Sequence, residues 1–84
     1  MPELTTRDFD ILSRLNEAGG FPTKHIARSL DSEAYEKNAR LQSSAVGFLL
    51  RSLERRGLVA KLDDQKPICW VRTLAGSKAL KEPL

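Results

Sequence analysis

Cysteine and histidine are scarce in this sequence of 84 residues, which contains one of each, Cys69 and His25. A single cysteine excludes an internal disulfide, and these two residues cannot supply the ligand set of a zinc site. We therefore expect a fold that is stabilised by its apolar core, with no metal and no cofactor.

Long apolar runs are also missing. The longest uncharged run of this kind, residues 43–50, is far shorter than the roughly 20 residues that a membrane-spanning helix needs. The first residues lack the basic start of a signal peptide. These features predict a cytoplasmic protein that does not enter a membrane.

The residue groups that mark an enzyme are missing as well. The chain offers no nucleophile with a plausible base and orienting acid, no glycine-rich phosphate loop and no cluster of metal ligands. Hydrophobic residues make up 40% and charged residues 30%, which is typical of a soluble globular protein. A chain this short builds one core, so we expect a single non-enzymatic domain over residues 1–84.

Charge is distributed unevenly along the chain. Residues 1–39 carry five basic and seven acidic side chains, whereas residues 40–84 carry nine basic and four acidic ones. A basic half is typical of a surface that binds a polyanion, because neutralised phosphates release their counterions. A basic surface that is merely solvated is the alternative.

Three helices are predicted in the first two thirds of the chain. The first is capped by Thr5 or Thr6 and ends at Gly19-Gly20. The second is capped by Thr23 and runs to about Tyr35, so that residues 31–40 are a helix extension followed by a loop. The third, from Leu41 or Gln42 to Arg56, is predicted by an apolar stripe and a terminal Gly57; the stripe consists of Val46, Leu49, Leu50 and Leu53.

A hairpin and a short helix are predicted after Gly57. Residues 58–62 and 68–72 are rich in β-branched and apolar side chains and flank a polar turn at 63–67. Thr73 then caps a last helix from Leu74 to about Lys81.

The order of these elements carries a family resemblance. The pattern Leu50-x-x-Leu53-x-x-x-Gly57-Leu58-Val59, then a hairpin, then Trp70-x-x-Thr73-x-x-Gly76-x-x-Ala79-Leu80, resembles the winged-helix transcription regulators of the MarR and PadR type over residues 23–81. The resemblance implies an α+β, mainly α fold: a winged helix-turn-helix of three helices, a two-stranded β-wing and a short C-terminal helix. Segment 31–40 is longer than the usual turn of about three or four residues between the second and third helices.

This resemblance implies a small prokaryotic or phage regulator that binds double-stranded DNA sequence-specifically as a homodimer. The third helix would enter the major groove, with the 58–72 hairpin as the wing. Small side chains opposite its apolar stripe allow close approach, arginines can contact guanine or phosphate, and Gln42 can read adenine. The candidate DNA-binding residues are Lys24, Arg28, Arg40, Gln42, Ser43, Ser44, Gly47, Arg51, Arg55, Lys61, Lys66 and Arg72.

Other interpretations remain open for these residues. Each basic side chain can simply be solvated, and Gly47 can serve packing against a neighbouring helix. Phe48 lies on the polar side of the third helix, where it is either covered by segment 31–40 beside Tyr35 or contacts a protein partner. The main alternative function is therefore a winged-helix protein-interaction module, and RNA binding is a third, less favoured by the few aromatic residues.

Overall fold

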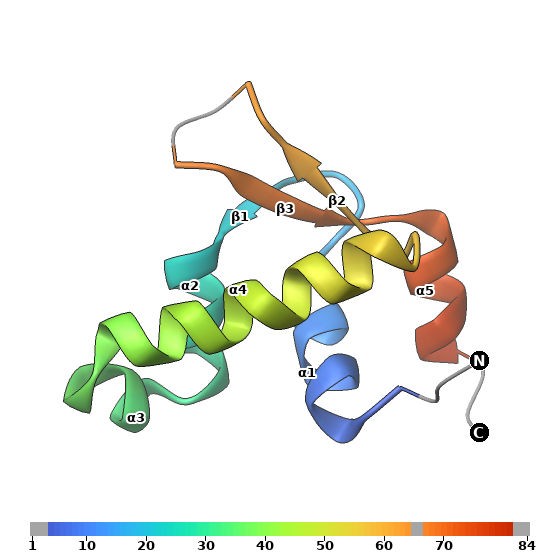
Figure 1. Ribbon diagram of the computed structural model, residues 1–84. Helices are drawn as coiled ribbons and strands as arrows, with labels where there is room; N and C mark the ends of the chain where they lie inside the picture. The colour runs from blue at the N-terminus through green and yellow to red at the C-terminus, as the bar shows by residue number, and fades with distance from the viewer. Residues whose placement is uncertain (1–3, 65–66, 82–84) are drawn as a thin grey trace.

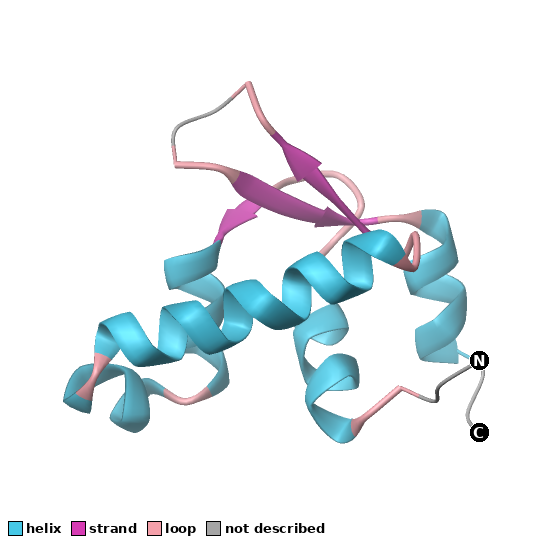
Figure 2. Ribbon diagram, viewed as in Figure 1, coloured by secondary structure: helices cyan, strands magenta, loops and turns pink. Residues whose placement is uncertain are grey.

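The computed structural model describes residues 4–64 and 67–81 (Figure 1). These residues form five helices and a three-stranded antiparallel sheet, which confirms the prediction of an α+β, mainly helical fold (Figure 2). The elements in chain order are α1 (Thr6–Arg14), β1 (Phe21–Pro22), α2 (Thr23–Leu30), α3 (Ser32–Lys37), α4 (Ala39–Arg55), β2 (Val59–Leu62), β3 (Cys69–Arg72) and α5 (Leu74–Lys81).

The predicted start of the first helix is confirmed, but its predicted end is wrong. Thr5 and Asp8 form a capping box, in which each side chain accepts a hydrogen bond from the other residue's backbone N–H. The helix ends at Arg14, well before Gly19. The side chain of Asn16 instead accepts hydrogen bonds from the N–H groups of Ala18 and Gly19, which folds this segment into a turn.

Residues 31–40 differ most from the sequence prediction. In place of a helix extension and a loop they contain α3, so four helices rather than three precede the hairpin in the described residues. Asp31 accepts a hydrogen bond from the N–H of Ala34, and Asn38 accepts one from the N–H of Leu41. Asp31 and Asn38 each end one helix and cap the next, so α4 begins at Ala39, earlier than predicted.

The predicted hairpin is confirmed, but the sheet has three strands rather than two. β3 lies at its centre, with β2 on one side and β1 on the other. Phe21 and Pro22, for which no strand was predicted, pair with Trp70 and Cys69 of β3. Proline is tolerated here because β1 is an edge strand with one side unpaired.

The core lies where α4 crosses α1 and α2 beneath the sheet (Figure 1). Val46, Leu50 and Leu53 of the predicted stripe on α4 are buried, and Leu49 is half-buried. Trp70 is also buried, and its Nε1–H donates a 3.0 Å hydrogen bond to the hydroxyl of Thr23. The prediction that Thr23 caps α2 is therefore wrong, because the cap position is Pro22 and no side chain caps this helix.

The C-terminal helix is held by a close backbone approach. Thr73 accepts a hydrogen bond from the N–H of Gly76, which confirms it as the cap of α5. The carbonyl of Leu58 accepts a hydrogen bond from the N–H of Thr73 and lies directly against the Cα of Gly76. A side chain at position 76 would overlap this carbonyl oxygen. The backbone approach therefore requires a glycine three residues after the cap residue Thr73.

Candidate nucleic-acid interface

The outer face of α4 is the longest exposed helical surface among the described residues. This outer face consists of seven exposed side chains, which are Arg40, Leu41, Ser44, Ala45, Phe48, Arg51 and Arg55. α4 contains a single acidic residue, Glu54, which is half-buried on the flank of the helix. The outer face therefore combines three arginines and two large apolar side chains with no carboxylate.

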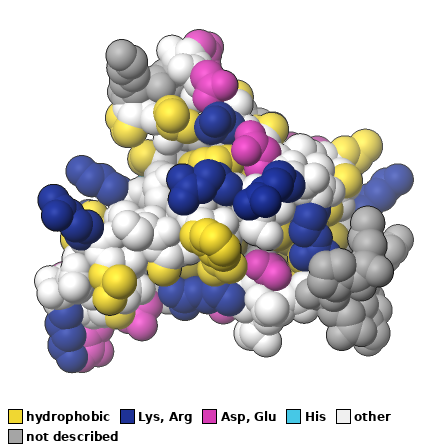
Figure 3. Space-filling model, viewed as in Figure 1, with side chains coloured by type: hydrophobic (Ala, Val, Ile, Leu, Met, Phe, Trp, Pro, Cys, Tyr) yellow, Lys and Arg dark blue, Asp and Glu magenta, His cyan; other side chains and the backbone are white. Residues whose placement is uncertain are grey.

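Phe48 projects into solvent at the centre of this face, with 62% of its surface exposed. The alternative in which segment 31–40 covers Phe48 is wrong. Tyr35, the large side chain of that segment, is buried instead, and the guanidinium of Arg28 lies 5.3 Å from the centroid of its ring. Figure 3, which looks onto α4, shows hydrophobic side chains at the centre of this view beside several Lys and Arg side chains.

Gly47 lies beside the N-terminus of α2. A Cβ built on Gly47 would be 3.8 Å from Cγ2 of Thr23, an ordinary van der Waals contact. The packing of α2 on α4 therefore leaves room for a side chain here, so helix packing does not explain the glycine. Since Arg51 and Ser44 are neighbours of Gly47 on the helix surface, the arginine side of α4 adjoins the start of α2.

Gln42 and Ser43 lie on opposite flanks of α4, where both are partly buried. Of the candidate residues on this helix, the structure brings Arg40, Ser44, Arg51 and Arg55 together on the outer face. Gln42 and Ser43 stand at its edges, closer to the core.

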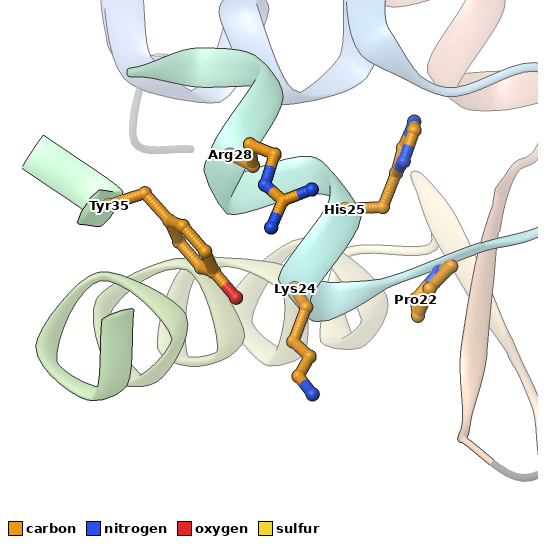
Figure 4. Close-up of a pocket in the computed structure, with 5 residues that line it drawn as sticks. All are labelled: Pro22, Lys24, His25, Arg28 and Tyr35. Atoms are coloured by element: carbon orange, nitrogen blue, oxygen red, sulfur yellow. The ribbon is translucent and has the colours of Figure 1, made fainter. Parts of the chain in front are cut away.

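A second basic surface lies at the start of α2. A shallow pocket of about 240 Å³ is lined by Pro22, Lys24, His25, Arg28 and Tyr35. Figure 4 shows that Lys24 and His25 point in different directions, and that the guanidinium of Arg28 lies beside the ring of Tyr35. No side chain caps the first N–H groups of α2, so the positive end of this helix adds to two exposed cations, Lys24 and Arg28. Such a surface suits the oxygens of a phosphate group.

The hairpin is less basic than the sequence predicts. Lys61 forms an ion pair of 3.7 Å with Asp63, and Asp63 and Asp64 are both exposed. Acidic side chains are visible over the hairpin at the top of Figure 3. The predicted contact residue Lys66 lies outside the described residues.

Arg72 is half-buried, and its guanidinium makes hydrogen bonds within the fold. Its Nη1 donates a 2.9 Å hydrogen bond to the carbonyl of Leu12, and its Nε donates one of 2.9 Å to the hydroxyl of Ser77. That hydroxyl in turn donates to a carboxylate oxygen of Glu17 at 2.6 Å. Arg72 thus ties β3 to α1 and α5, and two of its guanidinium nitrogens are already hydrogen-bonded within the fold.

Comparisons of the chain with protein-family models, with curated proteins and with solved structures find no match. Within the described ranges, no three His, Cys, Asp or Glu side chains lie close enough together to hold a metal ion. None of the helices described has the length and hydropathy needed to cross a membrane.

Proposed function

We propose that the protein binds double-stranded DNA, with the outer face of α4 in the major groove and the start of α2 on the flanking phosphates. One observation carries this proposal: α4 exposes Arg40, Arg51 and Arg55 on a face that holds no carboxylate. A helix is one of the few elements that fit the major groove, and arginine is the side chain that most often contacts guanine there.

The arrangement of the elements supports the same proposal. α2 and α4 pack against each other ahead of the β2–β3 hairpin, which is the order of a helix-turn-helix followed by a wing. In this winged-helix interpretation α3 is an additional helix between the two helices of the motif. α3 separates α2 and α4 along the sequence, but α2 still packs against α4.

A sequence-specific regulator in the cytoplasm is the role that we propose for this domain. A single copy contacts few base pairs, so we further propose a homodimer formed through α1 and α5. Leu74 of α5 is 65% exposed, which gives that helix an apolar contact point. In such a dimer the two α4 helices lie about 34 Å apart, one turn of DNA.

The first prediction concerns Arg51. We expect Arg51→Ala to weaken binding to the best duplex by roughly 5- to 150-fold, about 1 to 3 kcal/mol, because one charge-assisted contact is lost. The duplex is selected from a random library, and affinity is measured by fluorescence anisotropy at several salt concentrations. If Arg51 contacts a phosphate, the plot of log K against log salt is less steep for Arg51→Ala than for wild type, by about one unit of slope.

Lys37→Ala is the matched control, because it removes one exposed positive charge from α3, which is placed neither at the DNA nor at the dimer contact. It should leave the affinity for the same duplex nearly unchanged. Equal affinities of wild type and Arg51→Ala, or a binding constant that does not vary with salt, would contradict the proposed DNA contact.

The exposed Phe48 and Leu41 favour a second candidate function, in which the outer face of α4 docks on another protein. An apolar contact of that kind depends weakly on salt, whereas a contact with several phosphates weakens steeply as salt rises. The salt titration therefore separates the two functions.

A further inference from the structure

The apolar side chains on the outer face of α4 have no obvious partner on the sugar-phosphate backbone of DNA. Phe48 is 62% exposed and Leu41 is 58% exposed, and they are seven residues apart on one side of the helix. Leaving two such side chains in water is unfavourable unless a partner covers them. Their partner should therefore offer apolar groups within a highly charged surface.

We infer that Phe48 and Leu41 contact the 5-methyl groups of thymines, so that the duplexes this protein prefers contain thymine at defined positions. This inference rests on the proposed DNA-binding function. In the major groove, thymine is the base that presents a methyl group, whereas the other edge positions are hydrogen-bond donors and acceptors. An apolar side chain directed at the groove floor gains most from that methyl group.

Phe48 lies on the side of α4 that enters a groove deepest, about 20° around the helix from Arg55. Successive helical positions are rotated by about 100°, which places Phe48 directly opposite the midpoint of the buried stripe, Val46, Leu50 and Leu53. Arg51 lies about 60° to one side of Phe48 and Ala45 about 60° to the other. Arginine on the flank can reach the backbone or a guanine while Phe48 faces the base edges.

The spacing of the two apolar side chains adds a geometric expectation. Seven residues of α-helix span about 10.5 Å along the axis, which corresponds to about three base-pair steps of 3.4 Å. If α4 lies along the groove, the two contacted thymines are separated by about that distance. Ser44, which lies on the same face between Leu41 and Phe48, is small enough to let both side chains approach the bases.

The test compares two duplexes that differ only in the methyl group. One is an alternating adenine-thymine duplex, and the other has deoxyuridine in place of every thymidine. Burying one methyl contributes about 0.8 kcal/mol, so wild type should bind the thymine duplex about fourfold more tightly for each methyl contacted, and about 15-fold for two. Affinity is measured by fluorescence anisotropy at one fixed salt concentration.

The variant that isolates the effect is Phe48→Ala. Because Phe48 is exposed, the fold should tolerate this change, which circular dichroism and thermal unfolding will check. We expect Phe48→Ala to lower the preference for thymine over uracil by about fourfold, mainly through weaker binding to the thymine duplex. Ile68→Ala is the control, since Ile68 is another exposed apolar side chain and lies on the hairpin, outside the helix placed in the major groove, so this change should leave the preference unchanged.

Three outcomes overturn the inference. If wild type binds both duplexes equally but with a steep salt dependence, the DNA-binding function stands and the thymine contact is refuted. If Phe48→Ala weakens both duplexes equally, the phenyl ring contacts another part of the DNA. If wild type binds neither these duplexes nor duplexes from a random library at low salt, the proposed function itself is refuted, and docking on a protein becomes the role of Phe48.

Discussion

Gly76→Ala is expected to lower the free energy of unfolding by about 3 kcal/mol, as measured by urea denaturation. The Cβ of an alanine would overlap the carbonyl oxygen of Leu58 and would lie 2.9 Å from Cγ of Arg72. The carbonyl cannot easily move, because it accepts the hydrogen bond from the N–H of Thr73 at the start of α5. Forcing additional volume into a packed site typically costs about 1 to 3 kcal/mol, and a rigid backbone neighbour places this site at the upper end.

The second helical glycine gives the matched control. In Gly47→Ala the new methyl meets only Cγ2 of Thr23, at the comfortable distance of 3.8 Å. This variant should be as stable as wild type or more stable by up to about 1 kcal/mol, because alanine favours the helical state more than glycine does. Equal unfolding midpoints for Gly76→Ala and Gly47→Ala would show that α5 can shift away from Leu58.

The second large effect is expected at Arg72. We predict that Arg72→Ala lowers the free energy of unfolding by about 2 to 3 kcal/mol, since hydrogen bonds that involve a charged group contribute about 1.5 to 3 kcal/mol. The change removes the donors to the carbonyl of Leu12 and to the hydroxyl of Ser77. It also removes the side-chain hydrogen bonds that join β3 to α1 and α5.

Two measurements separate this structural role from a role at the DNA. Lys61→Ala removes a cation from the neighbouring strand, where the side chain pairs with the exposed Asp63, and should change stability by less than about 0.5 kcal/mol. At a temperature where both are folded, Arg72→Ala should bind duplex DNA as wild type does. Unchanged stability together with weakened DNA binding would return Arg72 to the interface.

The sequence predicted the elements whose side chains repeat with a regular period. The apolar residues of α4 recur at helical spacing, and the structure buries Val46, Leu50 and Leu53 as predicted. The caps formed by Thr5 and Thr73 were also predicted, because each depends on contacts within four residues along the chain. Local signals of this kind need no knowledge of the tertiary structure.

The sequence predictions failed in two situations. In one, a contact with a residue far away in sequence fixed the role of a side chain, and in the other, the residue type favours both loops and helix caps. Thr23 is a good capping residue, but its hydroxyl accepts the indole N–H of Trp70, which is far away in sequence. Asp31 was predicted inside the second helix and Asn38 in a loop, although both residue types favour helix caps, and that preference was the overlooked signal for α3.

The structural role of Arg72 was not predicted, although the sequence held a signal for it. Alternate residues of a strand point to the same face of the sheet, so Arg72 shares the face of Trp70. A buried Trp70 therefore implies that Arg72 also points toward the helices, as the structure shows. The basic surface of the hairpin is correspondingly smaller than predicted, and the outer face of α4 is the principal basic surface on the candidate site.

The joints at Asp31 and Asn38 have a consequence for the energetics of association. Each joint is a single residue, so α2, α3 and α4 follow one another without a flexible connector. The start of α2 and the exposed arginines of α4 are thus held at a fixed separation before any ligand arrives. Preorganisation of this kind reduces the conformational entropy lost on binding. In the proposed complex with DNA, the bending needed for a good fit would have to come from the duplex.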